Sequence, residues 1–219
     1  MHCVKLQHRF RKIVGVAGVL AGICCCPIAS QAQSLGLPGV SLPGLPAPPP
    51  PTSGGSQASA ATATVLGAVT SLVGTGVLTS ASVPLGAGMV AGGIPGLLSA
   101  EAMQASTMGW TDQVASEASL GNLAMTIGGV NLLADFIMSR ALTTSTAGSS
   151  GISNIEGLTI AGIPIAVTGA PNQVISLPGL SLILNEQTLS VGGIVVNALH
   201  ARTLDGLTNV VVGSSAANM

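Results

Sequence analysis

Charged side chains are scarce in this chain. Of its 219 residues, seven are acidic and six are basic, so 6% of positions are charged, whereas a typical soluble domain carries about 25%. Four of the six cations lie before residue 13, and no Asp, Glu, Lys, Arg or His occurs between Ile13 and Ala100. This composition is far from that of an ordinary cytosolic enzyme.

Aromatic residues and cysteine are also limited. Tyr is absent, Phe and Trp together number three, and Gly alone accounts for 30 residues. Any core must therefore be built from aliphatic and small side chains. The four cysteines all lie before residue 27, at Cys3, Cys24, Cys25 and Cys26. No disulfide is expected in the rest of the chain, so stability must come from a core or from assembly.

The N-terminus has the three regions of a secretory signal peptide. A basic start is followed by the apolar run Ile13 to Ile23, then by Pro27 and by small residues up to Ala32. We predict a signal at residues 1–32, cleaved after Ala32. A membrane anchor is disfavoured because the run is shorter than the roughly 20 residues that span a bilayer. A lipoprotein signal is disfavoured because Cys24 follows Ile23 rather than a small residue.

Removal of this segment leaves an acidic chain. Residues 33–219 contain two arginines, Arg140 and Arg202, against all seven acidic residues, a formal charge of −5. Two isolated arginines cannot form the basic stripe that binds a phosphate backbone, so a nucleic-acid partner is set aside. We predict a secreted or cell-surface location for this bacterial-type exported chain.

The remaining chain divides by composition into a spacer and a domain. Residues 33–56 are rich in Pro, Gly and Ser, and Pro48 to Pro51 favour an extended polyproline geometry. Residues 57–219 are predicted to form one β-rich domain, with the place of residues 57–95 left open. Ala60 to Leu78 alternates better as a strand than as a helix, although the small-residue helix of a membrane protein is the alternative.

A repeated unit predicts hairpins in this domain. It consists of an apolar residue, a hydroxyl residue, a β-branched residue, a small residue, Gly and another β-branched residue, and its glycines are Gly129, Gly162 and Gly193. A small residue followed by Gly between β-branched residues is typical of a tight hairpin turn, because Gly reaches positive φ without steric cost. We expect all three glycines at such turn positions, and Gly193→Val to be costly.

These hairpins favour an all-β fold. We predict an antiparallel β-sandwich or barrel-like domain, with a β-solenoid as the alternative because the units recur every 31 to 33 residues. Pro164, Pro171 and Pro178 argue against regular solenoid stacking. Val114 to Ala118 could form a short helix after Asp112, and little else after Gly93 has a helical period.

Residues with catalytic chemistry are few after residue 32. His200 is the single histidine there, with Asp205 as its nearest carboxylate in sequence, and no Gly-x-Ser-x-Gly motif accompanies it. We favour a partly buried strand histidine over a catalytic base. One histidine and no cysteine exclude the usual zinc sites. We predict no catalytic, cofactor-binding or metal-binding residues, and no cofactor.

Two polar clusters and one aromatic residue are the candidate sites. Asn172 and Gln173 form one cluster, and Asn185, Glu186 and Gln187 form the other. Asn and Gln at strand ends usually bond the backbone of their own turn, and the sharper hypothesis is that both clusters meet as one structural polar corner. Trp110 is the candidate for a binding loop, because an indole stacks on sugar rings.

From about Gly96 onward the chain resembles the choice-of-anchor P family of exported bacterial proteins. The residues that carry the resemblance are Ser153-Asn-Ile-Glu-Gly-Leu-Thr-Ile-Ala-Gly-Ile-Pro-Ile-Ala-Val-Thr-Gly-Ala-Pro-Asn-Gln, Leu184-Asn-Glu-Gln187, Val196-Asn-Ala-Leu-His200 and Val210-Val-Val-Gly-Ser-Ser-Ala216. The resemblance implies a β-rich surface protein and no catalytic residues. The C-terminal residues lack the apolar span, basic cluster or sorting motif of anchored forms.

Two functions follow as expectations. The first is a non-enzymatic, secreted or cell-surface structural protein that associates with itself, as an oligomer or filament, or with the cell envelope. Few charges lower the electrostatic barrier to association, and unpaired strand edges are templates for it. The second is a soluble extracellular binding module for a glycan or peptide, with the loops around Trp110 and between Gly169 and Gly179 as the site. No transmembrane span is expected after residue 32.

Overall fold

The structure, a computed structural model, describes residues 55–79 and 83–219. The chain divides into two units, residues 1–42 and 43–219, and all described residues belong to the second. The predicted signal peptide at 1–32 and most of the predicted spacer at 33–56 lie outside the described residues.

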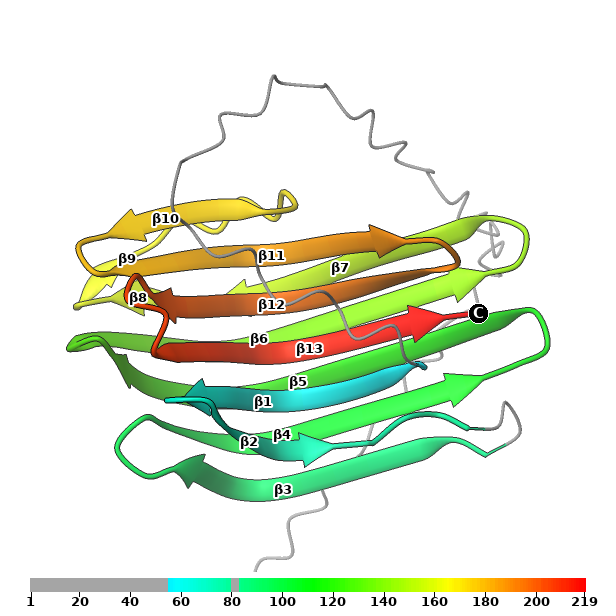
Figure 1. Cartoon of the computed structure of the whole chain (residues 1–219), viewed down its shortest axis with the longest axis horizontal. Coiled ribbons are helices and arrows are strands. Elements are labelled where there is room, and N and C mark those ends of the chain that lie inside the picture. Colours follow the sequence, from blue (N-terminus) through cyan, green and yellow to red (C-terminus); the bar gives the residue numbers. More distant parts are fainter. Residues whose placement is uncertain (1–54, 80–82) are drawn as a thin grey trace, which may run out of the picture. The chain divides into compact units, whose positions relative to one another are not determined.

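The described part of the chain forms thirteen β-strands and no helix. All strand pairs are antiparallel and belong to two sheets (Figure 1). Sheet A has the strand order β10-β11-β12-β13-β1-β2, and sheet B has the order β3-β4-β5-β6-β8-β9, with β7 also paired to β6. The strands are β1 (Gln57–Val65), β2 (Ala68–Gly74), β3 (Leu85–Ile94), β4 (Leu98–Gly109), β5 (Gln113–Ile127), β6 (Val130–Thr144), β7 (Gly148–Glu156), β8 (Thr159–Ile160), β9 (Ile163–Pro164), β10 (Gln173–Leu177), β11 (Leu180–Ser190), β12 (Gly193–Thr203) and β13 (Thr208–Asn218).

The two sheets pack face to face. β13 lies against β5 and β6, β12 against β6 and β7, and β1 against β4 and β5. The core is the layer of side chains between them, as in other β-sandwiches. Neither sheet closes on itself, and the strands do not stack as solenoid coils, so the predicted antiparallel sandwich is confirmed.

Two of the three predicted hairpin turns are confirmed, and the third is displaced by one residue. Gly128 and Gly129 have φ of 58° and 77°, and Ala161 and Gly162 have φ of 50° and 78°, as the two central residues of such a turn require. In the third unit the turn is Val191-Gly192, because Ser190 pairs with Gly193 at the strand ends. The expectation of positive φ at Gly193 is therefore wrong.

Gly193 remains a position where a side chain does not fit, for a different reason. A Cβ there would lie 1.8 Å from the Asn218 Oδ1 and 2.7 Å from the Ala217 carbonyl oxygen. The constraint is the close approach of β13 and not the turn. The short helix considered at Val114 to Ala118 does not form, since these residues lie within β5 and alternate between buried and exposed.

The strands of sheet A reverse their inward-facing side at one transverse line. In β12, Ile194, Val196 and Ala198 are buried, and then Leu199 and Ala201 are buried, so two successive residues face inward. The other strands of sheet A named here also have two successive inward-facing residues, and the registers place these residues opposite one another. We call these pairs the kink line of sheet A: Leu184–Asn185, Ala198–Leu199, Val212–Gly213, Ala60–Ala61 and Leu72–Val73.

Sheet B has a matching line at which two successive residues face outward. In β6, Ala134 and Ile137 are buried, whereas Asp135 and Phe136 between them are not. The kink line of sheet B consists of Val90–Ala91, Glu101–Ala102, Gly121–Asn122, Asp135–Phe136 and Glu156–Gly157. Two successive residues thus face inward along the line in sheet A, and two successive residues face outward along the line in sheet B.

Positive φ angles accompany both kink lines. In sheet A, Val73, Asn185 and Gly213 have φ of 51°, 50° and 62°; in sheet B, Ala102, Asn122 and Gly157 have φ of 47°, 49° and 65°. Residues other than glycine rarely adopt positive φ, and they keep it only where the surrounding structure imposes it. The kink lines are therefore a feature of the whole sandwich rather than of one strand.

The kink lines divide the core into two unlike halves. On one side the buried residues are mainly large and aliphatic, including Leu123, Leu132 and Leu182. On the other side aliphatic residues such as Val114, Ile194 and Val196 are mixed with small and hydroxyl residues. Hydroxyls of sheet B bond directly to sheet A there: Ser116 Oγ donates to the Ala216 carbonyl at 2.7 Å, and Thr143 Oγ1 to the Ala217 carbonyl at 2.8 Å. We call the buried hydroxyl residues in this half the hydroxyl seam: Thr107, Ser116, Ser139, Thr143 and Ser215.

A substitution at Gly213 tests the close packing at the kink line. A Cβ there would lie 3.2 Å from the Ala198 Cβ and 3.3 Å from the Ile137 Cγ2, and φ is 62°. We expect Gly213→Ala to lower the free energy of unfolding by about 2–4 kcal/mol, from backbone strain and overpacking together. Gly206→Ala is the matched control, because φ is +73° and no atom lies within 4 Å of its Cβ. Denaturant unfolding curves with equal midpoints for both variants would contradict tight packing at Gly213.

Candidate functional site

A connected cluster of polar side chains lies on the outer face of sheet A, on β11, β12 and β13. Glu186 Oε2 accepts hydrogen bonds from Asn197 Nδ2 at 2.7 Å and lies 2.9 Å from His200 Nδ1. His200 Nε2 lies 2.7 Å from Asn209 Oδ1, and Ser214 Oγ donates to Asn197 Oδ1 at 2.7 Å. We call these five residues the His200 network.

The kink line explains why His200 belongs to this outer face. Before the line the even-numbered residues of β12 face the core, and after it the odd-numbered ones do, so His200 points outward with Asn197. Its register partner is Ile183 on β11 and Val211 on β13. Neighbouring side chains nevertheless cover it, since the residue is 4% exposed.

Both ring nitrogens of His200 are held by oxygen atoms as the side chains are oriented. The Glu186 carboxylate accepts a hydrogen bond from the Nδ1–H of His200, and Asn209 holds the other ring nitrogen.

The pKa of Glu186 is lowered from its ordinary value of 4.5. Burial alone raises the pKa of this carboxyl, but the hydrogen bonds from His200 and Asn197, with the positive charges of His200 and Arg202, outweigh burial. The network therefore holds an ionised carboxylate in a half-buried place.

This geometry does not match nucleophilic catalysis. Such a site needs a hydroxyl or thiol within hydrogen-bond distance of the base, and within the described ranges no serine hydroxyl bonds His200. Residues 55–79 and 83–219 contain no group of three or more His, Cys, Asp or Glu side chains that could hold a metal ion. The His200 network instead ties three neighbouring strands together through charge-assisted hydrogen bonds.

The two polar clusters singled out in the sequence are only partly brought together. Asn185, Asn172 and Gln187 contact one another. The backbone N–H of Asn172 donates to the backbone carbonyl of Asn185, and the backbone N–H of Gln187 donates to Asn172 Oδ1. The side-chain Nε2 of Gln187 donates to Asn185 Oδ1. Gln173 bonds within its own loop, accepting from Thr168 and donating to the Ala166 carbonyl. Glu186 points to the other face, into the His200 network.

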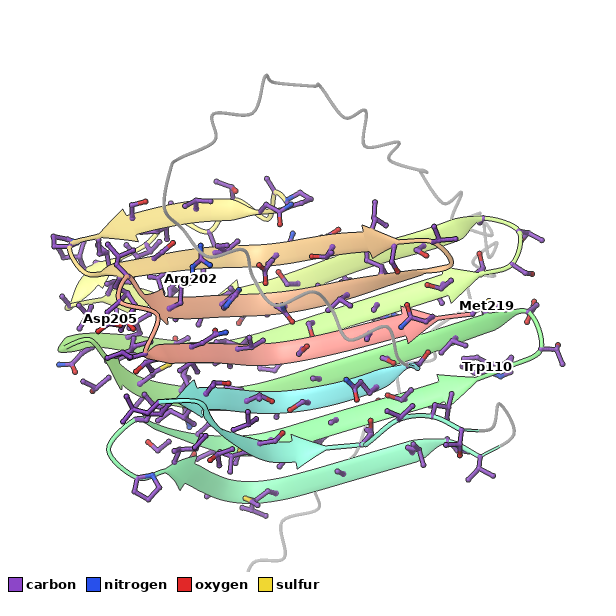
Figure 2. All side chains as sticks on the ribbon, viewed as in Figure 1. Trp110, Arg202, Asp205 and Met219 are labelled. Atoms are coloured by element: carbon purple, nitrogen blue, oxygen red, sulfur yellow. The ribbon has the colours of Figure 1, made fainter. Side chains whose placement is uncertain are left out.

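Trp110 lies in the turn between β4 and β5, where its backbone N–H donates to the backbone carbonyl of Gln113 at 2.7 Å. Its side chain is 45% exposed. Trp110 and Asp205 lie toward opposite ends of the strands (Figure 2). Trp110 does not line the depression on sheet A or the groove on sheet B described below.

A depression of about 360 Å³ lies on the outer face of sheet A beside the His200 network. Asn197 and Ser214 of the network line it, together with three hydroxyls that contact one another: Ser59 lies 3.1 Å from Thr62 and 3.2 Å from Ser71, and Thr62 lies 3.2 Å from Ser71. We call Ser59, Thr62 and Ser71 the hydroxyl triangle. Its oxygens retain lone pairs that can accept hydrogen bonds from a ligand.

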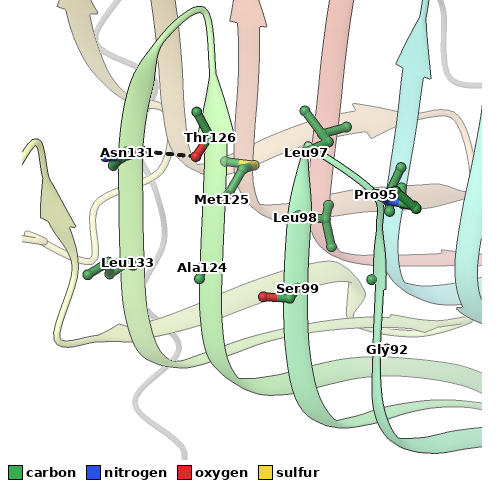
Figure 3. A pocket seen from close by; sticks show the side chains of 13 residues that line it. Gly92, Pro95, Leu97, Leu98, Ser99, Ala124, Met125, Thr126, Asn131 and Leu133 are labelled. Carbon is green, nitrogen blue, oxygen red and sulfur yellow. Dashed lines mark hydrogen bonds between the residues drawn. The ribbon is translucent and has the colours of Figure 1, made fainter.

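A wider groove of about 690 Å³ crosses the outer face of sheet B near one end (Figure 3). Gly93, Ser99, Ala124 and Leu133, paired across four successive strands, line it. Thr126 Oγ1 donates to Asn131 Oδ1 at 2.8 Å at its margin. Three of the four residues in this row are small, and Leu133 is the large one.

Comparisons of the chain with protein-family models, curated proteins and solved structures found no match. The resemblance to the choice-of-anchor P family therefore stays a prediction. Within residues 55–79 and 83–219, no helix is long and apolar enough to cross a membrane.

The lowered pKa of Glu186 predicts acid-sensitive stability. A carboxyl with a lower pKa in the folded state stabilises the fold above its unfolded pKa, and the contribution is lost as the pH falls through the folded value. We expect the melting temperature of the wild type to drop as the pH falls below about 4.5, and to drop less steeply in Glu186→Gln. Glu117→Gln, which removes an exposed carboxylate of sheet B, is the control. Identical acid profiles for the two variants would contradict this role of Glu186.

Proposed function

We propose that the chain is a non-enzymatic, exported structural protein that acts by associating with itself or with the cell envelope. The observation that carries this proposal is an uncharged edge of the sandwich, formed by β2 and β3. The predicted signal peptide and the resemblance to a family of exported surface proteins agree with it.

β2 is the last strand of sheet A and β3 the last strand of sheet B. The two strands contact each other and run along one side of the sandwich (Figure 1). Neither contains a charged residue or a proline, and Val69 and Val90 are 69% and 87% exposed. Soluble β-proteins usually protect such edges with charges, prolines or short strands, because unpaired N–H and C=O groups accept another strand.

The opposite edge of the sandwich is protected in these ways. β10 has five residues between Pro171 and Pro178, β9 has two residues and includes Pro164, and β7 carries Glu156. The contrast between the two sides supports a role for the β2 and β3 edge in association rather than a general shortage of charge.

Lysine substitutions at the edge test the proposal. We expect the mass of the exported wild-type chain, measured by analytical ultracentrifugation, to rise with protein concentration. Val69→Lys combined with Val90→Lys places charges on both edge strands and should keep the chain monomeric, with a circular dichroism spectrum like that of the wild type.

Val191→Lys is the control, since it makes the same change at a fully exposed residue of the β11–β12 turn. A wild-type chain that stays monomeric at all concentrations would overturn the proposal. Equal association of the edge variant and the wild type would show that another surface is used.

A second candidate function is supported by the hydroxyl triangle and the depression that it lines. Clustered hydroxyl and amide groups, as on Ser59, Ser71 and Asn197, can hydrogen-bond a glycan. Trp110 contributes nothing to this depression. We therefore place a glycan, if one binds, on the outer face of sheet A rather than in the loop around Trp110.

A glycan array with two variants tests this candidate. Ser71→Ala removes one hydroxyl of the triangle, and Trp110→Ala removes the indole at the other candidate position. We expect retained glycans to be lost with Ser71→Ala and kept with Trp110→Ala. The reverse result would return the site to the loop around Trp110, and no retention by the wild type would remove this function.

A further inference from the structure

We propose that the partner of the uncharged edge is a second copy of this chain, with β3 paired antiparallel to β3 and Val90 of one copy opposite Ala91 of the other. This inference rests on the proposed function, since it names the partner for self-association. It comes from the kink line of sheet B and from the side chains of β3.

A partner of β3 must match its kink. β3 pairs with β4 on one side only, so its other side presents backbone groups that an extended strand can satisfy. Within both sheets, the two kink residues of a strand lie opposite the kink residues of its neighbour; for example, Leu184 pairs with Leu199, Ala61 with Leu72, and Ala91 with Glu101. If a strand without a kink paired with β3, its outward-facing residues would lie opposite inward-facing residues of β3 beyond the kink.

A second β3 meets this condition. With Val90 opposite Ala91, the same two-fold rotation places Ala91 opposite Val90, so kink residues face kink residues on both strands. Inward residues then oppose inward ones: Met89 faces Gly92, and Ala87 faces Ile94. This alignment gives the two strands one register instead of several.

Side-chain sizes also fit this register. β3 reads Leu-Gly-Ala-Gly-Met-Val-Ala-Gly-Gly-Ile, and in the proposed pairing every larger residue opposes Gly or Ala, while Gly88 opposes Gly93. Residues directly opposite in an antiparallel pair interact, and like charges placed there would destabilise it. The strand has no charge that would repel its own copy.

The symmetry of this pairing limits its product to a dimer. A two-fold interface uses the same surface of both subunits and closes on itself. β2 lies against β3 at this edge, so the rotation also brings the β2 strands of the two copies toward each other. Larger assemblies would then be built from dimers through a different surface.

Cysteine cross-linking tests both the partner and the register. Opposed residues in an antiparallel pair have Cα atoms about 4.5–5.5 Å apart, within the range that a disulfide spans. Val90→Cys and Ala91→Cys chains are mixed in equal amounts and oxidised, and the cross-linked peptides are identified by mass spectrometry. We expect the 90–91 cross-link between copies to be the main product.

Gly86→Cys is the control on the same strand. Its side chain faces outward, with the nearest atom 3.9 Å from its Cβ, but in the proposed register the two copies of residue 86 lie at opposite ends of the pair. We expect no cross-link between them.

The outcomes separate this inference from the proposed function. A 90–91 cross-link without one at residue 86 supports β3 pairing. A chain that associates in the ultracentrifuge without the 90–91 cross-link, or with a cross-link at residue 86, overturns the β3 pairing and leaves self-association standing. A strictly monomeric chain overturns both.

Discussion

The reversal of facing at the kink lines is the constraint on which the rest of this structure depends. Paired residues of neighbouring strands face the same side of a sheet, so a strand can switch which residues face the core only where its neighbours switch too. The reversal at Gly213 or Asn122 is therefore repeated across the whole sheet. The outward position of His200 and the pattern of side chains on the free β3 edge both follow from this constraint.

The sequence predicted the fold class because its signals for strands and tight turns are local. Gly128-Gly129 and Ala161-Gly162 lie at turns because the glycine in each pair adopts positive φ without steric cost. In the third unit, Val191-Gly192 and Gly192-Gly193 are both acceptable turns, and only the fit of β12 against β13 decides between them. Val114 to Ala118 was considered as a short helix, but long-range pairing with β4 and β6 makes it a strand.

The candidate site was harder to predict, and the one-residue displacement of the turn explains part of this. A turn at Val191-Gly192 places Glu186 opposite Asn197, whereas a turn at Gly192-Gly193 would place Glu186 opposite Leu199 and hide the network. The remaining contacts, from His200 to Glu186 and Asn209, also depend on the kink line, which simple alternation does not reveal. A correct prediction of the β11–β12 turn would therefore have revealed the contact between Glu186 and Asn197, but not the contacts of His200.

The hydroxyl seam has a mechanical consequence. The bonds from Ser116 and Thr143 to carbonyl oxygens of β13 are directional and fail when the donor moves by a fraction of a residue. Interdigitated aliphatic side chains resist sliding of the two sheets throughout the core. On one side of the kink lines these directional bonds add a second resistance to shear.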